Sequence, residues 1–319
     1  MPARIHIVLA TRNGREYLAE QIESILAQDE SDWALLIRDD CSSDGTDSLI
    51  AEYEARDSRI EQLDNGGRPS GSAMANFARL LEEAARRDAR YVFCCDQDDV
   101  WSPDKLTIML TELERAERDE STPVLVHHDL AIVDEKLELR EASYWQAMRI
   151  VPRDEAAAQR FLSRNEVTGC AMAFNRALLE IALPLPGEAI MHDWWLALCA
   201  AYFGRLRFTG KRLVRYRQHA DNAIGAKSFW AGLAPDAAIR NWRAGNAEFA
   251  ATVRQARSFL QRHRNRLSPR QLAEITDYAS LLESGRLKRL QLMARSGAWR
   301  KHWLLNATLI ARLLTMKNR

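Results

Sequence analysis

Three carboxylates lie within four residues at Asp96-Gln97-Asp98-Asp99, directly after the apolar run 91–95. Like charges this close repel one another and raise each other's pKa unless a cation lies between them. A hard divalent cation would relieve that repulsion and would also bind the oxygens of a diphosphate. The alternative is a solvated acidic loop that caps the following helix at Pro103. The cluster therefore predicts either a cation site or a charged surface loop.

Two more polar segments follow apolar runs earlier in the chain. Thr11-Arg12-Asn13-Gly14 comes after residues 5–10, and Asp39-Asp40 comes after residues 33–38. In open α/β sheets, ligands bind outside the carboxyl ends of the strands, where a carboxylate can accept a hydrogen bond from a nucleobase or a ribose hydroxyl. An Asx turn explains Asp39-Asp40 equally well. Three convergent polar loops together predict a pocket.

Two further residues are candidates for chemistry. Asp193, in His192-Asp193-Trp194-Trp195, precedes an almost wholly apolar helix, where it is either a helix cap or a general base in a partly dry site. Flanking indole rings suit such a site because they stack on sugars. His219 ends a predicted strand and is either a metal ligand, a phosphate contact or a structural histidine.

Strands and helices alternate through the first half of the chain, which is typical of a parallel α/β sheet. Ser102 is expected to cap a helix that has Pro103 in its first turn. Residues 129–139 predict a hairpin or loop, and 206–219 a pair of strands that turn at Gly210. From about residue 229 the pattern is helical, with breaks near 268–269 and 296–297.

Composition narrows the class of protein. The five cysteines form no C-x-x-C pair, which argues against a disulfide framework and a zinc knuckle and favours a reducing cytoplasm. We expect no signal peptide and no membrane-spanning helix, because no apolar run is long enough. Phosphate-loop, dinucleotide, zincin and nucleophile-elbow motifs are all missing, which weighs against ATPases, dehydrogenases, zincins and α/β-hydrolases.

Charge divides the chain into two regions, which we predict to be domains of residues 1–226 and 227–319. The second holds 18 Lys and Arg against 5 Asp and Glu, whereas the first is acidic. Such a basic module suits an anionic partner, and its end combines basic residues with apolar ones. A membrane surface, or alternatively a helical cap or homodimer contact, is expected there. The apolar residues are Trp299, Trp303, Leu304, Leu305, Leu309, Leu313 and Leu314.

The motifs, in this order, resemble the family 2 inverting glycosyltransferases of the GT-A fold. That resemblance covers about residues 4–225 and implies a Rossmann-like, mixed and mostly parallel sheet flanked by helices, with a C-terminal helical extension. Residues 37–46 are similar to the family's "DDGSTDGT" element, and Asp96-Gln97-Asp98-Asp99 is similar to its metal-binding D-x-D. The resemblance implies nucleotide contacts from Thr11, Arg12, Asn13, Asp40 and Asp96, and Mg²⁺ or Mn²⁺ held by Asp96 and Asp98, for which His219 is a further candidate ligand.

The resemblance also implies how the sugar acceptor is bound and activated. Asp193 is the candidate base, although His192 replaces the acidic residue that usually precedes it. The family's Q-x-x-R-W motif of processive members is absent, which favours transfer of a single sugar. The acceptor-side residues are Trp101, Thr168, Gly169, His192 and Trp194.

Asp-Gln-Asp-Asp-Val-Trp and Tyr216-Arg217-Gln218-His219 look most like the bacterial rhamnosyltransferase branch. This branch implies a dTDP-L-rhamnose donor, and a saccharide or lipid-linked saccharide acceptor in cell-surface polysaccharide synthesis at the inner face of the membrane. A sugar-phosphate nucleotidyltransferase, a glycoside hydrolase and a nucleic-acid-binding protein are alternatives. The last is disfavoured because the acidic clusters of residues 1–226 would repel nucleic acid.

Overall fold

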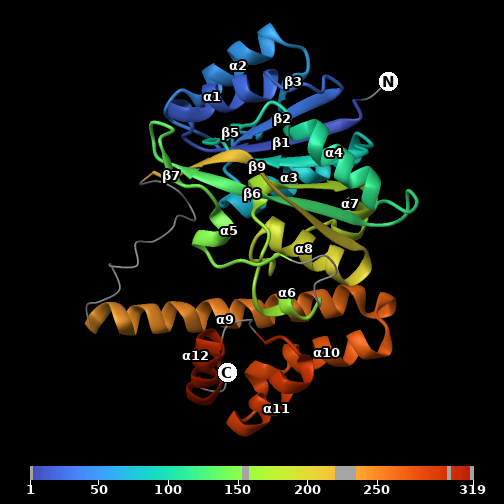
Figure 1. Ribbon diagram of the computed structural model, residues 1–319, viewed down its shortest axis with the longest axis vertical. Coiled ribbons are helices and arrows are strands. Elements are labelled where there is room, and N and C mark those ends of the chain that lie inside the picture. Colours follow the sequence, from blue (N-terminus) through green and yellow to red (C-terminus); the bar gives the residue numbers. More distant parts are fainter. Residues whose placement is uncertain (1–2, 153–157, 220–234, 300–302, 317–319) are drawn as a thin grey trace. The chain divides into compact units, whose positions relative to one another are not determined.

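The computed structural model describes residues 3–152, 158–219, 235–299 and 303–316. They form two compact units, and Figure 1 shows the elements of both. The first contains the described parts of 1–155, 167–185 and 191–223, and the second those of 156–166, 186–190 and 224–319. The predicted boundary between residues 226 and 227 lies outside the described residues.

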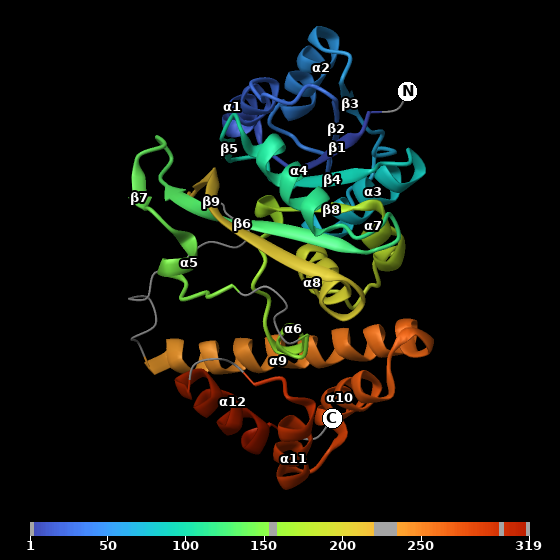
Figure 2. The ribbon, with the colours of Figure 1, turned by 45° about the vertical axis from the view of Figure 1, so that its right-hand side comes forward.

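The first unit is built on one mixed sheet with the strand order β3-β2-β1-β4-β8-β6-β9-β5, in which β7 pairs with β6 (Figures 1 and 2). Neighbouring strands from β3 to β4 are parallel, β8 is antiparallel to both β4 and β6, and β9 is parallel to β6 and antiparallel to β5. The mixed α/β architecture is confirmed. The strands are β1 (Ile5–Thr11), β2 (Trp33–Asp39), β3 (Ile60–Gln62), β4 (Tyr91–Cys95), β5 (Val100–Trp101), β6 (Val124–Val133), β7 (Leu139–Glu141), β8 (Met172–Asn175) and β9 (Arg205–Arg217).

Helices cover both faces of this sheet, because alternate residues of its central strands are buried on each side. On one face Ile7 and Leu9 belong to a core cluster with apolar residues of α1 (Arg15–Leu26), α2 (Thr46–Arg56) and α4 (Lys105–Ala116). Val8 and Cys94, whose side chains alternate with these, are equally buried. On this second side α3 (Ala73–Arg86) packs against α7 (Arg176–Ala182) and α8 (His192–Phe203).

The parallel strands carry the polar segments to one edge of the sheet. Thr11 at the end of β1 is in register with Asp39 at the end of β2, and Leu9 is in register with Cys95 at the end of β4. The chain leaves all three strands in the same direction. The predicted convergence of the three loops is therefore confirmed.

Three local predictions need correction. Residues 205–217 form one long strand, and Gly210 lies where the pairing of β9 with β6 shifts register, so it marks a bulge rather than a turn. Strand β6 continues to Val133 before a hairpin to β7, because its apolar side chains stay buried through Leu130 and Val133. Helix α4 begins at Lys105 with Asp104 at its N-cap, two residues after the predicted cap.

The second unit contains the helices α9 (Pro235–His263), α10 (Pro269–Ala279), α11 (Arg286–Ser296) and α12 (Trp303–Thr315), together with α6 (Arg160–Ser163). Both predicted breaks are confirmed: Ser268 and Gln271 form a capping box, and Gly297 ends α11 in the left-handed conformation. The start of the helical pattern at residue 229 lies outside the described residues. Within the described ranges, no helix has both the length and the hydropathy needed to cross a membrane.

Candidate active site

The loop after β1 is fixed by the acidic tetrapeptide that follows β4. The side-chain oxygen of Gln97 accepts hydrogen bonds from the Thr11 hydroxyl at 2.7 Å and from the Arg12 backbone amide at 2.8 Å. A Cβ on Gly14 would lie 2.6 Å from the same Gln97 oxygen, so only glycine permits this approach. Arg12 and Asn13 remain exposed at the edge of the sheet.

The loop after β2 locks onto the first loop through reciprocal hydrogen bonds. The amide of Asn13 donates to the Ser42 hydroxyl at 2.7 Å, and the amide of Ser43 donates to the Asn13 side chain at 3.0 Å. Asp39 accepts from the Ser42 amide at 2.8 Å, three residues further along, so its side chain stabilises a local turn although the bond is one residue longer than that of an Asx turn. The turn reading of Asp39-Asp40 is thus correct for Asp39.

Asp40 has a different environment from Asp39. It is buried, its Oδ1 accepts hydrogen bonds from the Ser70 amide and from Arg38 (3.4 Å), and Arg38 is itself held by Asn76 at 2.7 Å. Burial acts to raise the pKa of Asp40, but the hydrogen bonds from Ser70 and Arg38 outweigh it and hold the pKa below its usual value. Asp40 is therefore ionised at neutral pH, as a hydrogen-bond acceptor for a nucleoside must be.

The remaining residues of the tetrapeptide point to different partners. Asp98 lies 2.8 Å from Nε2 of His219, so the sequence candidates Asp98 and His219 are in contact. Arg217 donates from its backbone amide to Asp99 (3.1 Å) and from Nε to the Asp98 carbonyl (2.8 Å). The antiparallel pairing of β5 with the end of β9 produces both contacts, because it returns residues 217–219 to the tetrapeptide.

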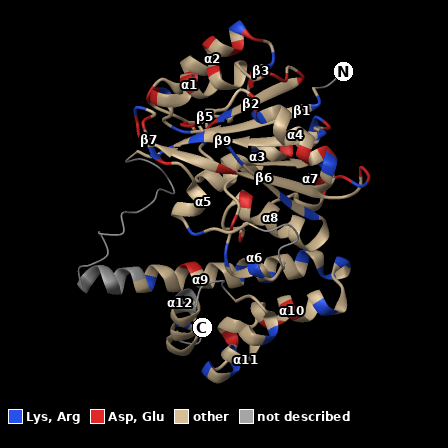
Figure 3. Ribbon diagram, in the orientation of Figure 1, with Lys and Arg blue, Asp and Glu red and all other residues tan. Residues whose placement is uncertain are grey.

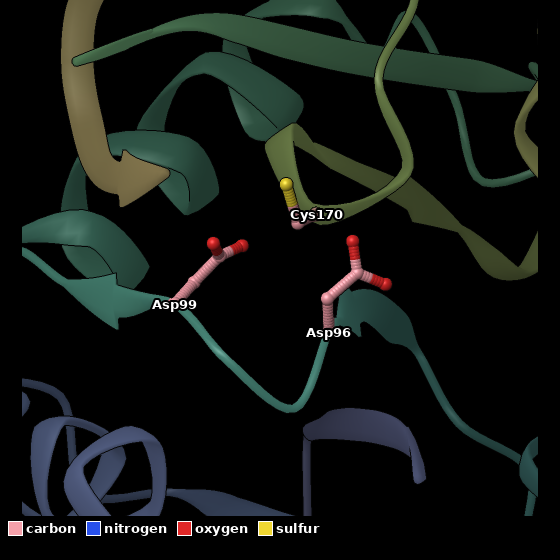
Figure 4. A group of neighbouring side chains, drawn as sticks. All are labelled: Asp96, Asp99 and Cys170. Carbon is pink, nitrogen blue, oxygen red and sulfur yellow. The ribbon is translucent and has the colours of Figure 1, made fainter. Parts of the chain in front are cut away.

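Asp96 and Asp99 flank the thiol of Cys170 (Figure 4), and ligand atoms of the three side chains lie within 4.8 Å of one another. Burial raises the pKa of Asp96 to about 7, with further contributions from Asp98 and Asp193. The pKa of Asp99 is raised well above its usual value, first by burial and then by Asp98 and Asp96. Burial and mutual repulsion therefore act together on the carboxyl groups of this cluster.

A buried cation lies beside this cluster. Lys105 has no exposed surface, donates to the Cys170 carbonyl at 2.8 Å, and lies 3.5 Å from the centre of the Trp101 ring. Burial lowers the pKa of Lys105 to about 8. Trp101, a predicted acceptor-side residue, is itself 3% exposed and belongs to the core.

The other acceptor-side candidates are gathered on α8 and the turn before β8. A Cβ on Gly169 would lie 3.0 Å from His192 Nε2 and 3.8 Å from Asp193 Oδ2, so both side chains flank this glycine. His192 is buried, stacks on Phe77 at 3.7 Å, and has a pKa lowered to about 3 by burial. Thr168 and Trp194 adjoin them, half-buried and buried respectively.

The sequence offered weak signals for residues that the prediction missed. Lys105 lies four residues before Met109, and eight before Leu113, on the apolar stripe of α4, which marks it as a buried lysine. Cys170 lies between the predicted Gly169 and the start of β8. Arg217, the last residue of β9, precedes the predicted His219 by two residues. Nothing local identifies Ser70 as a partner of Asp40.

A family model named "Glycosyl transferase family 2" matches residues 6–181, which is more than half of the chain. The chain belongs to glycosyl transferase family 2. Membership in this family favours a glycosyltransferase over the nucleotidyltransferase and glycoside hydrolase alternatives. The match includes the loops after β1, β2 and β4, together with the Gly169 turn.

Two curated bacterial relatives illustrate the range within this family. The chain is 36% identical over 104 residues to the putative teichuronic acid biosynthesis glycosyltransferase TuaG of Bacillus subtilis, an alignment that covers 32% of this chain and 38% of that protein. It is 25% identical to the dTDP-rhamnosyl transferase RfbG of Shigella flexneri over 233 residues, which cover 68% of this chain and 74% of RfbG.

Solved structures of glycosyltransferases share the fold. S. aureus TarS 1-349 in complex with UDP superposes with a TM-score of 0.52 at 15% identity, covering 98% of this chain and 89% of that one. The mannosyltransferase PcManGT from Pyrobaculum calidifontis, in complex with GDP-Man and Mn²⁺, gives a TM-score of 0.50 at 17% identity, covering 97% and 79%. At these identities the likeness shows the GT-A fold alone.

Proposed function

We propose that this family 2 glycosyltransferase transfers a single sugar, with inversion, from a nucleotide-diphosphate donor to a hydroxyl of a saccharide or lipid-linked saccharide. The observation that carries the proposal is geometric. Asp193 flanks Gly169, and the next residue, Cys170, shares a cluster with Asp96, so segments almost a hundred residues apart meet here. Asp98 and Asp193 also add to the effect of burial in raising the pKa of Asp96. A candidate cation ligand and a candidate base therefore lie in one region at the edge of the sheet.

The nucleoside of the donor would bind to the two interlocked loops. Asp40, held ionised by Arg38 and Ser70, would accept a hydrogen bond from the base, while Thr11, Arg12 and Asn13 would contact the nucleotide. Reciprocal hydrogen bonds between Asn13 and residues 42–43 hold these loops in place before a ligand arrives. Such preorganisation reduces the entropy that binding must overcome.

The residues fit a divalent cation. Asp98 and His219 already face each other at 2.8 Å, and the pKa of the neighbouring Asp96 is raised by burial and by the carboxylates of Asp98 and Asp193. Carboxylate oxygen and imidazole nitrogen are ligands that Mn²⁺ accepts, and carboxylate oxygen is the ligand that Mg²⁺ prefers. When bound, the cation would neutralise charge on the diphosphate leaving group.

Asp193 would act as the base toward the acceptor hydroxyl. It is 9% exposed and begins α8, where it adjoins Gly169 and His192. Its carboxylate would accept the hydroxyl proton as the acceptor oxygen attacks the anomeric carbon from the face opposite the diphosphate. One displacement of this kind inverts the anomeric configuration. Thr168, Gly169, His192 and Trp194 would border the acceptor.

The donor we favour is dTDP-L-rhamnose. The similarity to RfbG over most of both chains supports it, and the name of TuaG supports a role in cell-surface polysaccharide synthesis. UDP-sugars and GDP-mannose are the alternatives, because the solved structures of the same fold include complexes with UDP and GDP-Man.

Calorimetric titration of the full chain with dTDP, UDP and GDP, each with Mn²⁺ and with EDTA, tests this proposal. We expect binding of one nucleotide that weakens at least about tenfold in EDTA, and in Asp98→Ala, since each loses a charge-assisted contact worth about 1.5–3 kcal/mol. Lys136→Ala, in the loop between β6 and β7, is the control. Binding that is unchanged by EDTA would contradict a cation-assisted donor site.

We also propose that the enzyme binds peripherally to an anionic membrane, through α11 rather than the final helix. Leu309 and Leu313, two leucines of the predicted apolar stripe, are buried within the second unit. On α11, by contrast, whose basic positions are blue in Figure 3, Leu287 is 77% exposed between Arg286 and Lys288. Neither of these two basic residues forms an ion pair with the described part of the chain. An exposed leucine flanked by basic residues suits an interface with anionic lipids.

Flotation with liposomes tests the membrane surface. The wild-type chain should float with phosphatidylglycerol vesicles and less with neutral phosphatidylcholine vesicles. Leu287→Glu should reduce flotation severalfold, because it loses buried apolar area and adds a repelled charge. Gln291→Glu, one turn further along α11, adds the same charge without removing the leucine. Equal flotation of the wild type and Leu287→Glu would contradict a role for this surface.

A further inference from the structure

Three side chains, two of them fully buried, converge beside the proposed donor-cation site and play no part in the proposed function as a set. Ligand atoms of Asp96, Asp99 and Cys170 lie within 4.8 Å of one another. Asp99 and Cys170 have no exposed surface, and while Oδ1 of Asp99 accepts from the Arg217 amide, its Oδ2 accepts no hydrogen bond from the described part of the chain. A buried carboxylate oxygen without a partner is costly, which indicates that a ligand completes this cluster.

The chemistry of the cluster distinguishes it from the site at Asp98 and His219. A thiolate is a soft ligand that binds Zn²⁺, Cd²⁺ and Co²⁺ well, whereas Mg²⁺ requires oxygen ligands. Zn²⁺ holds carboxylate oxygens and thiolate sulfur at about 2.0–2.3 Å, which places ligand atoms about 3.3–3.8 Å apart. The three side chains need to close by only about 1 Å to reach that spacing.

Charge balance favours a divalent cation in this cluster. Two carboxylates and a thiolate carry three negative charges, and Lys105, which donates to the Cys170 carbonyl at 2.8 Å, supplies one positive charge. A divalent cation would neutralise the remaining two. Asp96 is the half-exposed member of the cluster, so an ion can reach the buried ligands past its carboxylate.

We propose that Asp96, Asp99 and Cys170 form a site for a thiophilic divalent cation, separate from the cation site at Asp98 and His219. Binding forms a bond between the cation and sulfur, and the thiol proton is released to solvent. Because Asp96 belongs to both sites, filling the thiol site draws this carboxylate away from the donor cation. Zn²⁺ or Cd²⁺ therefore inhibits an enzyme that works with Mg²⁺; this consequence for activity, unlike the site itself, rests on the proposed function.

Absorption spectroscopy with Co²⁺ tests the site without requiring activity. One equivalent of Co²⁺ added to the full chain should produce a sulfur-to-cobalt charge-transfer band in the near ultraviolet. Cys170→Ser should abolish the band, and Asp99→Asn, which retains the thiol, should weaken Co²⁺ binding at least about tenfold. Cys199→Ser is the matched control, because Cys199 is equally buried but lies in α8, outside the cluster.

Two outcomes overturn the proposal: no charge-transfer band in the wild-type chain, or an equal band in a folded Cys170→Ser variant. Thermal unfolding of each variant shows that it is folded. A Zn²⁺ titration of activity in Mg²⁺ then measures the consequence, with half-inhibition at least about tenfold higher in Cys170→Ser. The Co²⁺ band does not depend on nucleotide binding, so failure of the donor assignment leaves this test intact.

Discussion

Two acidic pairs follow β2 and β4, the parallel strands on either side of β1, and differ in the pKa of their carboxyl groups. Asp39 and Asp40 are supplied with donors by the protein itself, from Ser42, Ser70 and Arg38, and the pKa of Asp40 is lowered. Asp96 and Asp99 have few such donors, and the pKa of each is raised. Both pairs consist of aspartates, but only in the first pair do side chains and amides of the protein compensate the negative charge.

The opposite pKa shifts indicate different roles: the first pair suits recognition of the nucleotide, and the second region suits the reaction. A carboxylate that is already ionised and held in place can recognise a neutral nucleoside without any change in charge. A cluster that lacks positive charge instead gains most from a ligand that brings it, such as a cation with its diphosphate. We infer that the first pair selects the nucleotide and that the acidic tetrapeptide, through Asp96 and Asp98, positions the reacting part of the donor.

The largest expected effect is a loss of turnover when Asp193, the candidate base near Asp96, is substituted. Asp193→Asn should lower kcat about 10²–10⁴-fold, the contribution typical of a general base, because the amide cannot accept the hydroxyl proton. Nucleotide binding should stay within about twofold of the wild type. Measuring kcat and calorimetric binding on one preparation separates the two effects, with Asp119→Asn as a control outside the site. Near-normal turnover would show that Asp193 is not the base.

A smaller effect should appear in nucleotide binding, where Asp40 of the first pair and Asp98 of the tetrapeptide ought to respond differently to the cation. Asp40→Asn should weaken binding about ten- to hundredfold both with Mn²⁺ and in EDTA, because it removes a charged hydrogen-bond acceptor. Asp98→Ala should weaken it only when Mn²⁺ is present. If Asp40→Asn also weakens nucleotide binding only when Mn²⁺ is present, Asp40 and Asp98 act together and the distinction between them is wrong.

The smallest effect should appear in stability as a function of pH. For Asp96, whose pKa is raised to about 7, the folded chain holds the proton more tightly, so its stabilising contribution is present below the unfolded value of 3.8 and is lost as pH rises toward 7. For Asp40, whose pKa is lowered, the contribution is present above 3.8 and is lost as pH falls.

Thermal unfolding in EDTA between pH 3 and 8 measures both contributions. Asp96→Asn should flatten the loss of Tm between pH 4 and 7, and Asp40→Asn should flatten the loss at acid pH. Adding Mn²⁺ should raise the Tm of the wild type most at the alkaline end, where the carboxylates are ionised. If Tm changes with pH in parallel for the wild type and both variants, the opposite pKa shifts of Asp96 and Asp40 are contradicted.

Much of the fold and of the site's location could be predicted from local sequence. The apolar runs that end at Ala10, Arg38 and Cys95 identify parallel strands, and their polar successors therefore meet at one edge. The contact between Asp98 and His219 was not predictable in the same way, because it depends on how β9 pairs with β5 across more than a hundred residues. The partners of Asp40 were likewise hidden in the loop before α3.

Burial was the second property that sequence could not assign. The leucines of the last helix have the pattern of a membrane-binding face, yet an internal helix contact requires the same pattern, and Leu309 and Leu313 serve that purpose here. Lys105 was overlooked for the opposite reason. A lysine is expected at the surface, and only its position on the apolar stripe of α4 reveals that it is buried.

The paired residues of β9 make this strand a spacer of fixed length. Over the span in which it pairs with β6, β9 uses thirteen residues where its neighbour uses ten, and the first extra residues are at Gly210 and Lys211. A bulged residue adds no length along the partner strand, whereas each paired residue advances the chain by about 3.3 Å. Losing one paired residue between Arg212 and Arg217 would therefore withdraw His219 by about 3.3 Å from the tetrapeptide. Insertions and deletions in the family should therefore be excluded from this strand, while the adjoining hairpin at β7, which delivers no predicted site residue, is free to vary in length.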